Sequence, residues 1–392
     1  MSEEWRFVPA GSVTKQRRET VRLQPGVEYR AMGVRWHGKG AYSRGTITTE
    51  TVKAKTLYRA RAGDFVFNRI DTQKGAFDVV PHGLDGSLAT NEFPLYEVDR
   101  KQVDARFLLL YFQQAEVRRQ IGLARAGSEG RARWKEADFE AWVVPLPPPA
   151  AQARIIETVA AIDAHIAALE AEADALNALL NGHKESRFSA FNASSPLKRL
   201  SDVMNEVKRP VDVDAATDYH QIGVRSHGRG IFSKDAVSGK DLGSKKVYWV
   251  EPGDLVINIV FAWEGAVAVI PPEIVGYCGS HRFPAYRRPD GGDVEFLRFM
   301  FSTNAGVGLL AACSPGGAGR NRTLNRRMLL ASEVAIPSPE EQAKVVAELH
   351  SMEAAVASTR AEIESLRSTR AALLSAMLNR EIEISQAERT VT

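Results

Sequence analysis

Apolar residues recur at alternating intervals of four and three in two long stretches of this chain. This spacing repeats every seven residues and places the apolar side chains along one side of an α-helix. Each stretch begins after prolines, at 147–149 and at 337 and 339. The positions are Ile155, Val159, Ile162, Ile166, Leu169, Ala173, Leu176 and Leu180 in the first stretch, and Val345, Leu349, Met352, Val356, Thr359, Ile363, Leu366, Arg370, Leu373 and Met377 in the second.

An apolar seam of this kind has two interpretations. It commonly packs a helix against a globular core, but a proline-marked start and a run of several heptads favour a coiled coil. We therefore predict helices over residues 150–181 and 338–378 that pair with each other in antiparallel orientation. The first of them would reach on the order of 50 Å at 1.5 Å per residue.

The segments that precede the two helices have a different pattern. Short β-branched and aromatic runs follow Gly-Asp pairs, as in "GDFVFNRI" from Gly63 and "GDLVINIVFAW" from Gly253, and are typical of strands that leave a turn. Helical patterns follow, such as "DARFLLLYFQQAEVRRQIG" from Asp104, whose Leu and Phe residues would cover a sheet. These patterns predict a mixed α+β globular domain before each helix.

The two halves of the chain repeat one another. "GVRWHGKGAYSR" from Gly33 and "GVRSHGRGIFSK" from Gly223 share seven of twelve residues and stand 190 positions apart. The same offset relates further matches, and a slip to 189 aligns Gly130–Arg133 with Gly319–Arg322. Such matches, in one order and at one offset, identify a tandem duplication. The further matches at 190 are Gly63-Asp64 with Gly253-Asp254, Asn68 with Asn258, Gly75-Ala76 with Gly265-Ala266, and Phe93-Pro94 with Phe283-Pro284.

The patterns together divide the chain. We expect globular domains at 1–148 and 193–337, a central helix at 149–192, a distal helix at 338–380 and a tail at 381–392. The fold class expected is α+β, as a duplicated globular domain, each copy followed by a long helix of the coiled coil.

Composition narrows the class of protein. The chain has 392 residues, 44% of them hydrophobic and 25% charged, as in globular proteins. Two cysteines exclude a disulfide framework, and no C-x-x-C spacing indicates zinc. The N-terminus lacks a basic start with an apolar run, and the longest apolar stretch contains Asn258 and Glu264, so we expect a cytoplasmic protein without a membrane partner. The net charge of +3 permits a polyanionic partner without requiring one.

Two glycine-rich basic loops occur in both halves and suit nucleic acid. Glycine lets a backbone approach a ligand closely, while Arg and Lys donate to phosphate oxygens and guanine edges. A solvated turn would explain one such loop, but recurrence of both loops in both halves favours function. The candidate DNA-contacting residues are Arg35, His37, Lys39, Arg44, Arg131 and Arg133 in the first half, and Arg225, His227, Arg229, Lys234, Arg320 and Arg322 in the second.

The two loops have different expected roles. We expect Arg131, Arg133, Arg320 and Arg322 to contact mainly phosphates, because they lie in Gly-rich turns without an aromatic or apolar partner for a base. Positions that differ between the copies, such as Trp36/Ser226 and Arg69/Ile259, would let each half prefer a different sequence.

No catalytic motif stands out. Asp64, Asp254 and Glu264 resemble the carboxylates of a metal-dependent nuclease, but Lys74 replaces Glu264 in the first copy, and a Gly-Asp pair before a strand is more simply a turn. The chain contains no P-loop, no Asn-Pro-Pro-Tyr or Asp-Pro-Pro-Tyr string and no histidine cluster with metal-ligand spacing. We expect a non-catalytic protein with no catalytic residue, metal or cofactor of its own.

The layout resembles the specificity subunit of type I restriction-modification systems. The family resemblance rests on "GDLVINIVFAWEGA" from Gly253 to Ala266, with its Ala-Trp-x-Gly ending, and on the proline-rich helix entry "IPSPEEQAKVV" from Ile336 to Val346. It extends from about Val13 to Met377. The first copy departs from the family pattern, since "FNRIDTQKGA" replaces the Ala-Trp ending and "PPPAAQA" lacks the Glu pair.

The resemblance implies a function and partners. Two target-recognition domains would read an asymmetric, bipartite site on double-stranded DNA, with its halves on the order of one DNA turn (~34 Å) apart. The expected partners are two methyltransferase (modification) subunits and restriction motor subunits, which would bring S-adenosylmethionine, ATP and Mg²⁺. Two other classes stay open from the residues alone: a self-contained DNA-modifying or DNA-cleaving enzyme, and a coiled-coil scaffold without DNA affinity.

Overall fold

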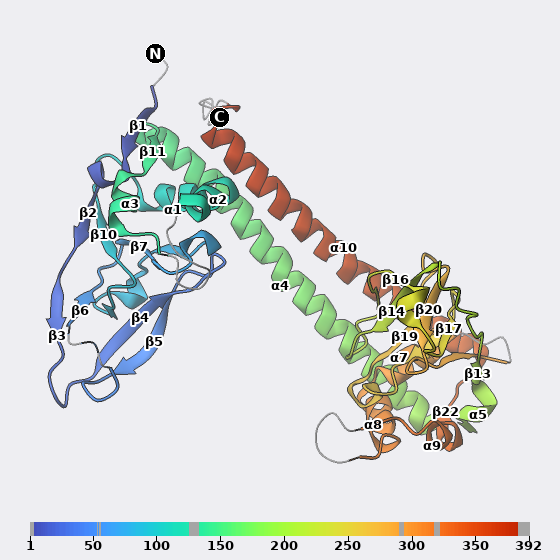
Figure 1. The fold of residues 1–392 in the computed structure, drawn as a ribbon. Helices are drawn as coiled ribbons and strands as arrows, with labels where there is room; N and C mark the ends of the chain where they lie inside the picture. Colours follow the sequence, from blue (N-terminus) through green and yellow to red (C-terminus); the bar gives the residue numbers. More distant parts are fainter. Residues whose placement is uncertain are drawn as a thin grey trace, which may run out of the picture. The chain divides into compact units, whose positions relative to one another are not determined.

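The structure is a computed structural model that describes residues 4–52, 54, 56–124, 133–289, 294–316 and 322–382. The chain divides into two compact units. Unit 1 comprises the described parts of 1–169 and 361–392, and unit 2 comprises those of 170–360. Each unit therefore contains one sheet-rich domain and a part of both long helices (Figure 1).

The sheets of unit 1 are built mostly from antiparallel strands. A ribbon pairs β1 with β11, a second sheet has the order β2-β10-β7-β8, and a third has the order β3-β6-β9-β4-β5. The strands are β1 (Arg6–Pro9), β2 (Thr14–Arg17), β3 (Thr20–Arg22), β4 (Tyr29–Val34), β5 (Ala41–Ile47), β6 (Thr56–Arg59), β7 (Phe65–Phe67), β8 (Phe77–Val79), β9 (Leu88–Ala89), β10 (Leu95–Val98) and β11 (Val143–Leu146). The short helices are α1 (Ala105–Gln113), α2 (Ala115–Ala124) and α3 (Glu136–Ala141).

The sheets of unit 2 repeat this plan. β12 pairs with β22, one sheet has the order β13-β21-β18-β19, and another has the order β15-β14-β20-β17, with β16 also paired to β14. The strands are β12 (Leu197–Arg199), β13 (Asn205–Val207), β14 (Asp218–Val224), β15 (Ile231–Ser233), β16 (Val237–Ser238), β17 (Val247–Trp249), β18 (Leu255–Ile257), β19 (Val267–Val269), β20 (Tyr277–Ser280), β21 (Ala285–Arg287) and β22 (Glu333–Ala335). The short helices are α5 (Leu200–Val203), α6 (Gly239–Leu242), α7 (Val294–Phe301), α8 (Asn304–Ala312) and α9 (Arg326–Ala331).

The strand registers confirm the duplication. In unit 1 the parallel pair β4–β9 aligns Ala31 with Leu88, and in unit 2 the parallel pair β14–β20 aligns Gln221 with Cys278. Both members of the second pair stand 190 residues after their counterparts, so the repeat found in the sequence is also a repeat of strand pairing. The mixed α+β class predicted for each half is confirmed as well.

Each domain has a core between a sheet and its short helices. In unit 1, rings from α1 and α3 meet rings from β7, with Phe65 and Phe139 stacked at a centroid distance of 5.5 Å. In unit 2, Phe296 and Phe301 of α7 share a buried cluster with Leu255 and Ile257 of β18. β7 and β18 are shorter than the apolar runs from Gly63 and Gly253 predicted. The chain turns at Asn68 and at Asn258, and a short 3-10 segment follows before β8 and before β19.

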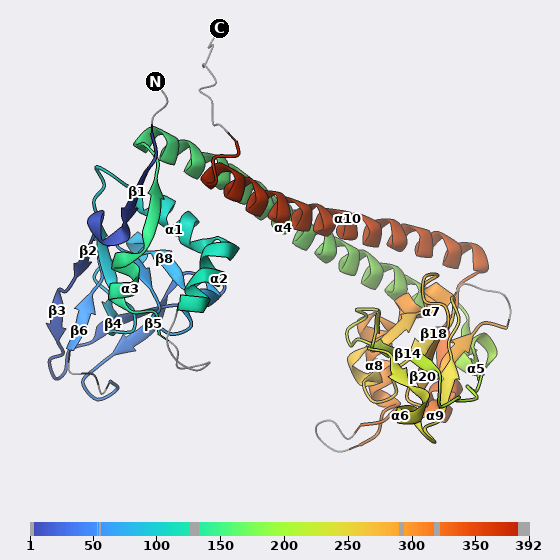
Figure 2. The same ribbon diagram turned by 45° about the horizontal axis from the view of Figure 1, so that its top comes forward.

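The two long helices, α4 (Pro149–Ser194) and α10 (Pro339–Leu378), pack against each other in antiparallel orientation, as predicted. They run side by side in Figures 1 and 2. In unit 1, Asp163 of α4 accepts from Arg370 Nη2 of α10 at 2.8 Å. In unit 2, His183 Nε2 lies 3.1 Å from Glu348 Oε2.

The side chains at the 4-3 positions lie away from solvent in both helices. None of these described positions is exposed. Those buried are Ile155, Val159, Ile166, Leu169, Ala173, Leu180, Val345, Leu349, Val356, Ile363 and Met377, and those half-buried are Ile162, Leu176, Met352, Thr359, Leu366, Arg370 and Leu373.

The first helix is longer than its heptads indicate. It continues past residue 181 to Ser194, because Phe188 and Phe191 extend its apolar face and join the unit 2 core beside Phe296. No helix among the described residues is long and apolar enough to cross a membrane.

Candidate nucleic-acid interface

The repeated Gly-Arg loops are built in the same way in both units. Each connects two antiparallel strands, β4 with β5 and β14 with β15. His37 and His227 have left-handed backbones, with φ of 62° and 60°. His37 donates its N–H to the turn that precedes β8, and His227 donates its N–H to the turn that precedes β19. The acceptors are Lys74 O at 2.6 Å in unit 1 and Glu264 O at 2.8 Å in unit 2. The backbone of each hairpin loop is therefore bonded to the turn before β8 or β19, whatever the side chains are.

The first glycine of each loop makes room for an arginine stacked on a ring. A Cβ on Gly223 would lie 2.2 Å from Phe232 Cζ, and one on Gly33 would lie 3.2 Å from Tyr42 Cε1. The guanidinium of Arg225 lies 4.9 Å from the Phe232 ring centroid, and that of Arg35 lies 4.1 Å from the Tyr42 ring centroid. Because stacking restricts an exposed Arg side chain, it presents its N–H groups to a ligand at a lower cost in entropy.

The hairpin loop of unit 2 forms one wall of a basic groove of about 1050 Å³. Four predicted residues line it, namely Arg225, His227, Arg229 and Lys234. Lys245, Lys246, His281 and Arg282 line it as well, and no Asp or Glu is among the described residues that do. Phe232, Phe261 and Phe283 supply its apolar surface. Arg and Lys side chains without carboxylates, interleaved with rings, form the kind of surface that attracts a polyanion with exposed base edges.

Sequence reasoning missed half of the Arg, Lys and His residues that line this groove. Lys245 and Lys246 precede β17, and His281 and Arg282 follow β20, strands that pair with each other and reach the hairpin only through the parallel β14–β20 pairing. The sequence signal for these residues was a basic dipeptide beside a strand. Such a dipeptide does not indicate which other segments of the chain lie next to it in the fold.

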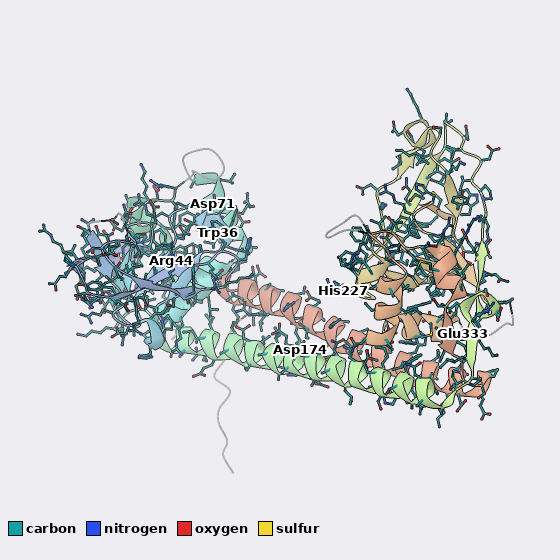
Figure 3. All side chains as sticks on the ribbon, turned by 90° about the horizontal axis from the view of Figure 1, so that it is seen from below. Trp36, Arg44, Asp71, Asp174, His227 and Glu333 are labelled. Carbon is teal, nitrogen blue, oxygen red and sulfur yellow. The ribbon has the colours of Figure 1, made fainter. Side chains whose placement is uncertain are left out.

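The corresponding residues of unit 1 are exposed but have more acidic surroundings. Arg35, His37, Lys39 and Arg44 all reach solvent. Asp78 Oδ2 accepts from Ala41 N at 2.5 Å at the base of the same hairpin. The exposed indole of Trp36 lies beside Asp71 in Figure 3, on the side of the domain that carries the hairpin loop.

The second basic loop is described only in part, because Arg131 and Arg320 lie outside the described residues. Arg133 Nη2 donates to Glu92 Oε1 at 2.8 Å, and the Arg322 guanidinium lies 5.5 Å from the Trp263 ring centroid. The premise that these arginines have no aromatic partner is therefore wrong for Arg322. Arg322 is not among the residues that line the groove.

The alignment of this loop also needs a correction. Trp134 N donates to Arg69 O at 3.0 Å, and Leu324 N donates to Ile259 O at 2.9 Å. These equivalent bonds relate the copies by 190 residues, so Arg133 corresponds to Thr323 and not to Arg322. The offset of 189 applies to α1 and α2 of unit 1 and to α7 and α8 of unit 2. It ends before this point, because fewer residues separate α2 from Trp134 than separate α8 from Leu324.

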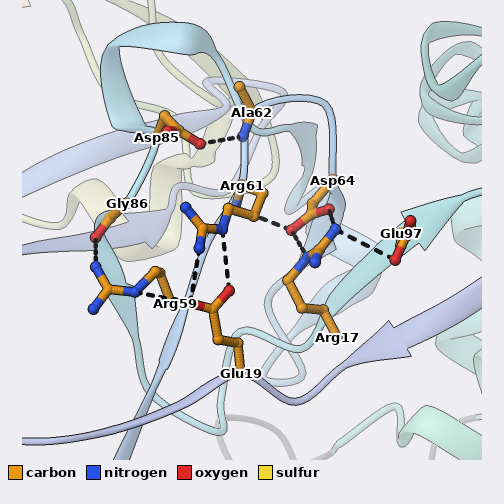
Figure 4. A network of polar contacts seen from close by, with 9 residues as sticks. All are labelled: Arg17, Glu19, Arg59, Arg61, Ala62, Asp64, Asp85, Gly86 and Glu97. Atoms are coloured by element: carbon orange, nitrogen blue, oxygen red, sulfur yellow. Dashed lines mark hydrogen bonds and ion pairs between the residues drawn. The ribbon is translucent and has the colours of Figure 1, made fainter.

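The Gly-Asp carboxylates are structural. Asp64 accepts from Arg17 Nε at 2.7 Å, from Arg17 Nη2 at 3.0 Å and from Arg61 N at 3.0 Å (Figure 4). Asp254 accepts from Arg209 Nη1 at 2.8 Å, from Arg287 Nε at 2.6 Å and from Glu251 N at 2.9 Å. Carboxylates with this many fixed donors close a turn and have few lone pairs left for a metal ion.

Other catalytic chemistry finds little support in the described residues. They contain no group of three or more His, Cys, Asp or Glu side chains placed to hold a metal ion. Burial raises the pKa of the Cys278 thiol, which keeps it protonated and poorly nucleophilic.

The whole-chain fold is similar to those of solved type I specificity subunits. The HsdS subunit from Thermoanaerobacter tengcongensis matches with a TM-score of 0.52 at 17% identity, over 97% of this chain and 98% of that chain. The type I restriction-modification system S subunit from M. genitalium matches with a TM-score of 0.54 at 12% identity, over 96% of each chain. A chain from a structural study of complex assembly and conformational transition of the type I R-M system matches with a TM-score of 0.61 at 17% identity, over 95% of this chain and 97% of that chain.

No family model matches the sequence, and no curated protein does. The resemblance that a few motifs indicated is therefore a likeness of fold over nearly the full length, at a sequence identity too low to carry residue roles from one chain to another.

Proposed function

We propose that this chain is the specificity subunit of a type I restriction-modification complex and reads double-stranded DNA with one domain in each half. The observation that carries the proposal is the groove of unit 2, in which eight Arg, Lys and His side chains and no carboxylate line the wall among the described residues. The full-length similarity of fold to type I specificity subunits supports the assignment of this groove to DNA.

The duplicated architecture supports a bipartite site. Each unit has its own hairpin loop with a stacked arginine, so each reads its own half-site. The side chains around the two loops differ, as at Trp36 and Ser226, so the halves differ in sequence and the site is asymmetric.

The proposed chain has no catalytic role, and its partners supply the chemistry. Two methyltransferase subunits transfer the methyl group of S-adenosylmethionine to DNA, and restriction motor subunits use ATP and Mg²⁺. The complex acts in the cytoplasm, on the DNA of the cell. A self-contained enzyme would instead turn over DNA with Mg²⁺ and S-adenosylmethionine when only this purified chain is present, and a scaffold would show no salt-dependent DNA binding.

Sequencing of methylated bases tests the proposal. Cells that carry this chain together with its methyltransferase subunit are expected to contain one methylated motif with two specific segments and an unread spacer. Cells with the methyltransferase subunit alone are the control and are expected to lack that motif. A continuous or palindromic motif, or the same motif without this chain, would contradict the two-domain reading.

Alanine replacement of a stacked arginine is expected to affect one half-site only. Arg225→Ala removes the guanidinium beside Phe232 and, if it contacts a base, costs about 1–3 kcal/mol of discrimination in the half read by unit 2. Arg35→Ala is expected to act on the other half. Competition binding with duplexes that carry single substitutions in either half measures both effects. If both variants disturb the same half, the assignment of one domain to each half is wrong.

Lysines of the groove are expected to contribute sequence-independent affinity. Lys246→Ala removes one exposed cation from the wall, so the slope of log K against log salt becomes shallower by about 0.9 for every DNA sequence. Lys198→Ala, an exposed cation on β12 outside the groove, is the matched control and leaves the slope unchanged. An unchanged slope in Lys246→Ala would show that this wall of the groove does not contact DNA phosphates.

A further inference from the structure

The hairpin loop contacts the turn before β8 in unit 1 and the turn before β19 in unit 2. At this contact, two side chains differ together between the units. The backbone of the contact is the same in both, since His37 and Gly38 donate to Lys74 O and Gly75 O as His227 and Gly228 donate to Glu264 O and Gly265 O. The side chains that meet across it differ in pairs, with Trp36 and Lys74 in unit 1 and Ser226 and Glu264 in unit 2.

The pair of unit 1 presents a cation. Lys74 Nζ lies 5.2 Å from the Trp36 ring centroid and 2.9 Å from Asp71 Oδ2. Trp36 Nε1 donates to Ile70 O at 3.2 Å, which fixes the indole plane under the ammonium. The Lys74 side chain is 35% exposed and has three N–H groups, so it can donate to a ligand while it keeps Asp71.

The pair of unit 2 presents an anion. Ser226 Oγ donates to Glu264 Oε2 at 2.7 Å, which orients the carboxylate, and Ser226 lines the basic groove. A carboxylate only accepts hydrogen bonds. Its net effect on binding to a polyanion is repulsive, so a carboxylate held at the edge of this groove needs an explanation other than affinity.

The two pairs therefore offer opposite hydrogen-bonding roles at equivalent points. In the major groove, adenine and cytosine present amino donors through N6 and N4, whereas guanine and thymine present carbonyl acceptors through O6 and O4. A carboxylate accepts from the first two bases, and an ammonium donates to the other two.

We propose that Lys74 and Glu264, each held by its loop partner, select the class of base at one position of each half-site. The strand that Glu264 contacts carries adenine or cytosine there, and the strand that Lys74 contacts carries guanine or thymine. This inference rests on the proposed function, because it assumes that both loops reach base edges in DNA. Trp36 and Ser226 are positioning residues that set the direction of the charged group.

Charge reversal at Glu264 tests the assignment. Selection of duplexes from a pool randomised over both halves, with the complex of this chain and its methyltransferase subunit, gives the preferred base at every position. One good base contact corresponds to a preference of about 5- to 150-fold. Glu264→Gln is expected to abolish the preference for adenine or cytosine at one position, because an amide both donates and accepts, and Glu264→Lys is expected to invert it to guanine or thymine.

Matched variants separate base selection from charge and folding. Glu273→Gln makes the same charge change at an exposed residue outside the groove and is expected to leave the selected sequence unchanged. Ser226→Ala keeps the carboxylate but removes its orienting hydrogen bond, so it is expected to weaken the same preference without inverting it. Lys74→Gln is expected to relax one position of the other half only. Thermal unfolding of each variant checks that the domain is intact.

The outcomes distinguish this inference from the proposed function. A bipartite motif that persists with an unchanged base in both Glu264 variants overturns the role of Glu264 and leaves the proposed function in place. The same holds if the base changes in the half that Lys74→Gln also affects. Absence of any bipartite motif with the unaltered chain overturns the proposed function itself.

Discussion

Replacement of Asp254 with alanine is expected to lower the free energy of unfolding of unit 2 by about 3 kcal/mol. The carboxylate is fully buried and accepts from Arg209, Arg287 and the Glu251 amide. Its removal leaves two guanidinium groups in a partly dehydrated site with only the half-exposed carboxylate of Glu251 as a counter-charge. The value stands at the lower end of the range for a broken buried ion pair, because side-chain exposures of 23% and 43% let water reach Arg209 and Arg287.

Hydrogen exchange measured peptide by peptide shows which part of the chain loosens. Faster exchange is expected in β18 and β21 of unit 2, with β7 of unit 1 unchanged. Glu251→Ala is the matched control, because Glu251 is 51% exposed in its ion pair with Arg209 and its loss is expected to cost under about 1 kcal/mol. A stable Asp254→Ala variant that has lost DNA modification would instead point to a chemical role for this carboxylate.

Replacement of Ile166 with aspartate is expected to destabilise the pairing of α4 with α10 by about 3 kcal/mol or more. Ile166 is buried in the seam, at 8% exposure, so the variant places a charge at a position that is largely removed from water. The expected result is a lower melting temperature, with faster hydrogen exchange along α4 and α10. Weaker association with the methyltransferase subunit is expected as well.

Ala168→Asp is the control for this variant. It introduces the same charge two residues away, at an exposed position of the same helix, and is expected to change the free energy of unfolding by less than about 0.5 kcal/mol. Equal melting temperatures for Ile166→Asp, Ala168→Asp and the unaltered chain would show that the seam contributes little to stability.

The sequence by itself determined the duplication and the helix pairing. A 4-3 spacing leaves few geometries in which Ile155, Ile166 and Leu180 all avoid water, and an antiparallel partner with the same spacing was available in the same chain. The hairpin loops were also recognisable, because the glycine that begins each one packs against a ring, at a distance that excludes a Cβ at Gly223 and leaves little room for one at Gly33. In these cases the physical requirement lies within one segment or repeats at one offset.

The tertiary structure alone decided which residues share a site. Lys246 and Arg282 belong to one groove with Arg225 because β14, β20 and β17 are neighbours in a sheet whose order is not the order of the chain. It decided which core the end of α4 joins, since the apolar partners of Phe191 come from a helix more than a hundred residues later. It also decided that Glu264 faces Ser226 and Lys74 faces Trp36, because these pairs meet only where two loops are joined by backbone hydrogen bonds. Spacing along the chain conveys what a segment needs for itself, whereas long-range contacts depend on every segment together.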